Sequence, residues 1–98
     1  MFGKKRPVNE LAPPPMASDL STSEVLRVWA GPDHPQQVTL RTTWPDPAAW
    51  GLLLVDIARH AAKAYARQGR DEAAVLQRIR EGLSAEWSSH TDEPIDIT

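Results

Sequence analysis

Two runs with a period of two predict a β-hairpin. In residues 24–30, Leu26 and Val28 alternate with side chains that point the other way, as in a strand, where successive side chains lie on opposite faces. A second alternating run, at 37–43, includes Leu40. The letters GPDHP between the runs are typical of a turn. We therefore expect two antiparallel strands at about 24–30 and 37–43.

The register of this hairpin follows from burial. The apolar members of both runs must share one face, because a slip of one residue would turn all of them toward water. Arg27, Trp29 and Arg41 are then placed together on the opposite face.

The pattern changes to a helical period after Trp44. Asp46 stands where an N-cap belongs, Pro47 suits the first helical position, and Gly69 can end the helix in the left-handed conformation. These signals predict a helix over about 47–68. Its apolar stripe consists of Trp50, Leu54, Ile57, Ala61 and Ala64, with Leu53 and Tyr65 widening it.

A second helix is predicted over about 71–89. Asp71 and Glu72 bring negative charge to its N-terminus, and its apolar stripe consists of Val75, Leu76, Ile79, Leu83 and Trp87. Gly82, inside this helix, predicts either the close approach of another backbone or local flexibility. The result is an α+β fold in ββαα order, with the hairpin packed on the two helices.

The ends of the chain have a different composition. Residues 1–23 are rich in proline, serine and small residues and are expected to form a disordered tail. The single α+β domain is then 24–90. Residues 91–98 form an acidic tail in which isoleucine alternates with polar residues, so this tail is either disordered or an added strand.

The composition excludes or disfavours several classes of function. The chain has 98 residues and no cysteine, so disulfides and thiolate chemistry are excluded. A net charge of −2 provides no basic field, which disfavours nucleic acid as a partner. We expect a cytoplasmic protein with no membrane contact, since neither a signal peptide nor a spanning segment is visible.

A small core predicts self-association. A folded part of about 70 residues usually gains only about 3 to 5 kcal/mol from its core, and an isolated hairpin is marginal. Without disulfides or a metal cluster, association is the remaining common source of stability. We therefore expect a homodimer, formed either through strand edges or through helices.

The hairpin face that carries Arg27, Trp29 and Arg41 is the candidate interaction surface. Two neighbouring guanidinium groups repel each other unless an anion, a carboxylate or an aromatic ring relieves them. The face is therefore either a solvated outer surface or a recognition surface for an acidic partner, a carboxylate or a phosphate.

No catalytic constellation is recognisable. Asp56 and His60 lie four residues apart on the first predicted helix, where they can form a local hydrogen bond or the start of a general base. The three histidines are scattered, so no metal and no cofactor are assigned. Among four tryptophans, Trp50 and Trp87 lie on apolar stripes and are expected in the core.

The segments VLRVWAG and DPAAWGLLLVDIARHAAKAY resemble a family of short bacterial proteins described as a domain of unknown function. The resemblance covers most of 24–87 and implies a shared fold, but it implies no activity, substrate or catalytic residue. The residues themselves favour a non-enzymatic protein-protein interaction module that binds an unidentified partner through the outer face of the hairpin or through a groove between the helices. The alternatives are a regulatory domain that binds a small anion through Arg27 and Arg41, and a small hydrolase or transferase at Asp56 and His60.

Overall fold

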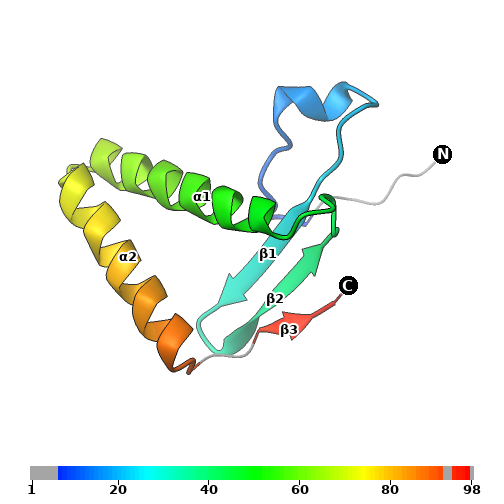
Figure 1. Cartoon of the computed structure of the whole chain (residues 1–98). Helices are drawn as coiled ribbons and strands as arrows, with labels where there is room; N and C mark the ends of the chain where they lie inside the picture. Colours follow the sequence, from blue (N-terminus) through cyan, green and yellow to red (C-terminus); the bar gives the residue numbers. More distant parts are fainter. Residues whose placement is uncertain (1–6, 92–93, 98) are drawn as a thin grey trace.

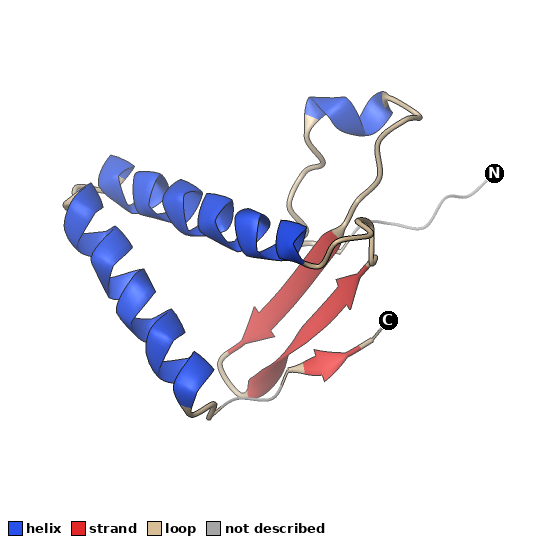
Figure 2. Cartoon of the chain, in the orientation of Figure 1, coloured by secondary structure: helices blue, strands red, loops and turns tan. Residues whose placement is uncertain are grey.

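The computed structural model describes residues 7–91 and 94–97, and it has the expected α+β architecture. A β-hairpin is followed by two helices, which confirms the ββαα order, and a short third strand comes after them. Figure 2 shows the strands side by side in one sheet, in the order β1-β2-β3, with both helices outside it.

The hairpin pairs in the predicted register. Strand β1 (Leu26–Gly31) runs antiparallel to β2 (His34–Leu40), with Leu26 opposite Leu40. Strand β2 begins three residues earlier than predicted. An irregularity between Trp29 and Gly31 lets Gly31 pair with His34 and leaves a short turn between the strands.

The last strand lies beside β2. Strand β3 (Ile95–Asp96) is parallel to β2, with Ile95 opposite Gln37, and the backbone N–H of Ile97 donates to the carbonyl of Val38 at 2.9 Å. Ile95 and Asp96 therefore form an added strand, which is one of the two alternatives predicted for the acidic tail. Residues 92, 93 and 98 lie outside the described part.

Both helices begin and end within one residue of the predicted bounds. Helix α1 (Ala48–Arg67) has Pro47 at its N-cap, one residue after the predicted Asp46, and Asp46 Oδ1 accepts from the backbone N–H of Ala48 at 3.0 Å. Gly69 follows α1 with φ of +95°, as its left-handed position requires. Helix α2 (Glu72–Ser88) is capped by Asp71, whose Oδ2 accepts from the N–H of Ala74 at 2.9 Å.

The segment before β1 follows a defined path, whereas a disordered tail was expected over 1–23. A 3-10 helix spans Pro15–Ser18. The carboxylate of Asp19 accepts from the backbone N–H of Ser21 at 2.9 Å and from its hydroxyl at 2.8 Å, and these bonds lower the pKa of Asp19. Residues 1–6 lie outside the described part.

The expected packing of the hairpin on the helices is not found. Helices α1 and α2 contact each other, but among the described residues no Cα of either helix lies within 8 Å of a Cα in a strand. In Figure 1, α1 leaves the sheet after β2 and α2 returns toward the start of β3, so the helices and the sheet form three sides of a triangle. The apolar stripes predict that one face of each helix needs to be covered, but they do not indicate which element covers it.

The core of the single chain is correspondingly small. Within the described ranges only Ala62 and Val75 are buried, with 1% and 6% of their surface exposed, and they come from the two helices. Val28, on the apolar face of the hairpin, is half exposed. The close approach of a backbone expected at Gly82 is absent within the described part, since a Cβ added there meets nothing within 4 Å.

Candidate functional site

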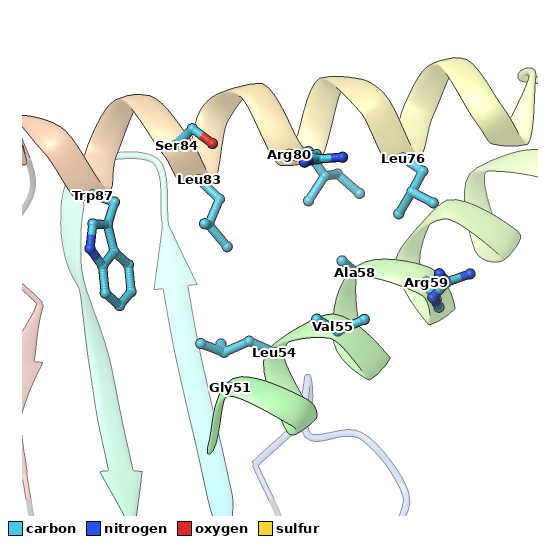
Figure 3. A pocket seen from close by; sticks show the side chains of 11 residues that line it. Gly51, Leu54, Val55, Ala58, Arg59, Leu76, Arg80, Leu83, Ser84 and Trp87 are labelled. Carbon is cyan, nitrogen blue, oxygen red and sulfur yellow. The ribbon is translucent and has the colours of Figure 1, made fainter. Parts of the chain in front are cut away.

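A hollow lies between the two helices, and we call it the helix pocket. It has a volume of about 480 Å³. In Figure 3, Leu83 and Trp87 of α2 point toward α1 across this space. Its apolar lining consists of Leu54, Val55, Ala58, Leu76, Ile79, Leu83 and Trp87, with Gly51 at one side.

The chemistry of the helix pocket is that of a binding surface. Most of its lining is aliphatic or aromatic, and its polar members are Arg59, Arg80 and Ser84. The two arginines come one from each helix, so their alkyl stems can extend the apolar lining while their charged ends remain in water. Such a hollow suits apolar side chains and offers no pair of acid and base for catalysis.

Trp87 departs most from its expected place. It was expected in the core, but it is 81% exposed at the end of the pocket. Trp50, by contrast, is half-buried and packs edge-on against Trp44, with ring centroids 5.4 Å apart and planes at 74°. The pattern placed both tryptophans on apolar stripes, but only Trp50 finds an aromatic neighbour there.

The predicted surface of Arg27, Trp29 and Arg41 is brought together on one face of the hairpin. The register places Arg27 opposite Thr39 and Trp29 opposite Gln37, and the backbone N–H of Arg41 donates to the carbonyl of Val25 at 3.0 Å. Since residues of the same parity point to the same side of these strands, this side is the one that the sequence predicted.

Carboxylates of the same chain already neutralise Arg27. Its guanidinium lies 2.9 Å from Glu24 Oε1 and 3.0 Å from Glu10 Oε2, and Glu24 raises the pKa of Arg27 through a hydrogen bond and its charge. Glu10 is largely buried, with 14% of its side chain exposed. The repulsion predicted between Arg27 and Arg41 is thus relieved by carboxylates of the same chain. Sequence reasoning assigned Glu10 to a disordered tail and did not single out Glu24.

Arg41 is also engaged locally, because its Nε donates to the backbone carbonyl of Glu24 at 3.1 Å. Together Arg27 and Arg41 fasten the segment before β1 to the hairpin. The described contacts therefore give both arginines a structural role.

Asp56 and His60 lie at the surface of α1, in a shallow depression that they share with Ile57 and Ala61. A third polar group does not line this depression. Among residues 7–91 and 94–97, no group of three histidine, aspartate or glutamate side chains is placed to hold a metal ion. Within these same ranges, neither helix is long and apolar enough to cross a membrane.

A groove between the helices was one of the two surfaces predicted for a protein partner, but Leu54, Ile79 and Leu83 were predicted in the core rather than around an open pocket. One signal could have revealed it. Two helices of 20 and 17 residues carry more apolar surface than a two-stranded hairpin can cover, so part of each stripe had to remain open.

Three comparisons place the chain among known proteins. No curated protein matches it. A solved structure described as that of "a putative pyruvate dehydrogenase from the photosynthetic bacterium Rhodopseudomonas palustrus CGA009" is 41% identical, with a TM-score of 0.66. The match covers 95% of this chain and 93% of that one. Residues 10–91 match the family described as "Domain of unknown function (DUF5076)". The match includes the segment before β1 as well as the hairpin and both helices, and the chain therefore belongs to the DUF5076 family.

Proposed function

We propose that this chain is a non-enzymatic protein-protein interaction module that acts in the cytoplasm and binds its partner at the helix pocket. The observation that carries the proposal is the exposed apolar lining of that pocket, above all Trp87 at 81% exposure. Contiguous exposed apolar surface on a small protein is typical of an interaction site. Tryptophan is enriched among the residues that dominate binding energy.

The shape of the helix pocket favours a protein partner. Two diverging helices form a groove whose lining is apolar, and such grooves receive the side chains of an amphipathic helix or a similar ridge. Exposed residues line it from both walls, for example Leu54 at 43% and Leu83 at 45%. An apolar ridge that covers both walls would withdraw these side chains from water together.

The alternative, a regulatory domain that binds a small anion, has less support. Of its two proposed contacts, Arg27 is paired with the carboxylates of Glu24 and Glu10, and Arg41 donates to the backbone carbonyl of Glu24. At Arg27 an anion would have to displace a carboxylate of the same chain. Titration with inorganic phosphate, followed by backbone amide shifts, should leave the face that carries Arg27 and Arg41 unperturbed, and saturable shifts there would favour the alternative.

The relative described as a putative pyruvate dehydrogenase calls for a direct test of the non-enzymatic part of the proposal. The purified chain should be incubated with pyruvate and an artificial electron acceptor, with and without a cell extract that supplies cofactors. We expect no pyruvate-dependent reduction above that of the extract alone. Sustained turnover that depends on the chain would overturn this part of the proposal.

The binding surface can be tested with a matched pair of variants on α1. Val55 lines the helix pocket and is 54% exposed, whereas Leu52 lies on the same helix, outside the pocket, and is 68% exposed. Affinity capture should lose the bound protein with Val55→Lys and retain it with Leu52→Lys. An Arg27→Ala/Arg41→Ala double variant should also retain it. Loss with the double variant alone would move the binding surface to the hairpin.

A further inference from the structure

The chain is more open than a compact protein of its size. Its accessible surface is 8840 Å², whereas a compact protein of 10.9 kDa exposes about 5,600 Å². Its radius of gyration is 15.9 Å, against about 13 Å for a compact domain of this length. Part of the excess belongs to the segment before β1, but the open walls of the helix pocket contribute as well.

The excess is large enough for an obligate interface. It amounts to about 3,200 Å², which exceeds the roughly 1,000 to 2,500 Å² that obligate dimers bury on each subunit, so a part of it is sufficient. With only Ala62 and Val75 buried among the described residues, the helix pair depends on a cover from the moment the chain folds. Another copy of the same chain is always present at the same concentration, so it can supply this cover.

The helix pocket also has the self-complementary form that twofold symmetry requires. A twofold interface uses one patch on both subunits, so this patch must carry both a projecting group and a recess. Trp87 projects at one end of the pocket. Gly51 lines the same pocket, and a Cβ added to it meets nothing within 4 Å, so space is left beside it.

The strand edges are poorer candidates for the interface. Strand β1 forms one edge of the sheet, but its ladder is irregular between Trp29 and Gly31, and Arg27 is tied to Glu10 of the preceding segment. Irregular ladders and charged side chains are devices that block edge-to-edge pairing. Strand β3, at the other edge, has only two residues.

We propose that the occupant of the helix pocket is a second copy of this chain, related by a twofold axis, with Trp87 of each copy inserted between α1 and α2 of the other. This inference rests on the proposed function, since it names the partner for the same pocket. Both apolar walls are then covered at once, and each chain receives the core that it lacks alone.

The first test is the oligomeric state of the whole chain. Sedimentation from low to high micromolar concentration should show a dimer for the wild type and for the Leu52→Lys control. The Trp87→Lys variant should dissociate at least about 30-fold more readily, as expected for a central tryptophan in an interface. Trp87 is so exposed in the single chain that its replacement should leave helix α2 intact, which circular dichroism checks.

A second measurement keeps the proposal testable if Trp87→Lys fails to fold. Because the chain has no cysteine, Ser84→Cys introduces a single thiol in the helix pocket, and Ser21→Cys introduces one in the exposed segment before β1. At high protein concentration a maleimide should label the Ser21→Cys thiol, whereas the Ser84→Cys thiol should be protected. On dilution, labelling at position 84 should rise as the dimer dissociates.

Two results would overturn the inference. A folded monomer with a reactive Ser84→Cys thiol would reject the second copy, and the proposed function would survive if Val55→Lys still lost a captured protein. A dimer in which this thiol stays reactive and Trp87→Lys has no effect would place the interface at the strand edges instead. Loss of both the dimer and the Val55-dependent capture would remove the inference and the proposed function together.

Discussion

The two ends of the helix pair differ sharply. At the closed end, next to the turn between α1 and α2, Ala62 and Val75 are buried and the guanidinium of Arg70 lies 5.3 Å from the centre of the Tyr65 ring. At the open end, Leu83 and Trp87 are 45% and 81% exposed. Both ends belong to the same two apolar stripes, so the periodic pattern alone does not determine burial.

Distance from the turn explains the difference. Two helices that diverge from a short connection can pack closely only near that connection. Farther along, their facing side chains no longer reach one another, and the space between them becomes the helix pocket. The closed end is thus packed within one chain, whereas the open end leaves its apolar side chains exposed.

The largest expected effect is at the closed end. Ala62→Asp would bury a carboxylate without a partner and should lower the free energy of unfolding by about 3 kcal/mol or more. The matched control is Leu52→Asp, at an exposed position of the same helix, which should change it by less than about 0.5 kcal/mol. Thermal unfolding followed by circular dichroism measures both. Equal losses would mean that the closed end is no better packed than the surface.

The open end should respond to protein concentration. Leu83→Ala should destabilise the concentrated protein by about 2 to 3 kcal/mol, because there the second copy buries this side chain. In dilute solution the proposed dimer has already dissociated before the chain unfolds. The loss in the free energy of unfolding should therefore fall below about 1 kcal/mol. Urea unfolding at two concentrations measures both values, and an identical loss at both would contradict the distinction between the two ends.

The turn that holds the closed end can be tested with two glycines. Gly69→Ala should destabilise by about 1 to 2 kcal/mol, because φ at this position is +95° and a side chain is strained there. Gly82→Ala should stabilise by about 0.5 to 1 kcal/mol, since Gly82 lies inside α2 with free space around it. The sign of the two changes, read from midpoints of urea unfolding, separates turn strain from helix propensity.

The smallest effect is expected at the hairpin. Arg27→Ala removes the ion pairs to Glu10 and Glu24 at an exposed site, so global stability should hardly change. Hydrogen exchange should instead accelerate in the segment before β1, for example at Ser21 and Thr22. The raised pKa of Arg27 keeps it charged at every ordinary pH, so its contribution is present throughout and is lost only in strong base. Unchanged exchange would show that this segment is held by its own local bonds.

The sequence predicted the local features of the fold well. Asp46, Asp71 and Gly69 act at the helix ends through their nearest neighbours, and the pairing of Leu26 with Leu40 follows from alternation. These features depend on sterics and hydrogen bonds over a few residues, which the order of residues determines directly.

The long-range features could not be predicted in the same way. The pairing of Glu10 with Arg27 joins residues 17 apart across a segment with no periodic pattern. The exposure of Trp87 depends on what lies across the pocket. An apolar stripe indicates only that its side chains need to be covered, and not which element covers them. Association was expected from the small core, and the surface that we propose for it follows from the divergence of the two helices, which the apolar pattern does not predict.

The helix pocket makes the number of residues in α2 matter, because Leu83 and Trp87 line it from the second half of that helix. A helix advances about 1.5 Å and turns about 100° with each residue, so one residue inserted before Leu83 would swing every later side chain around the helix axis. Leu83 and Trp87 would then turn away from α1. Homologous chains should therefore tolerate length variation in the turn between β1 and β2, but conserve the number of residues between Gly69 and Trp87.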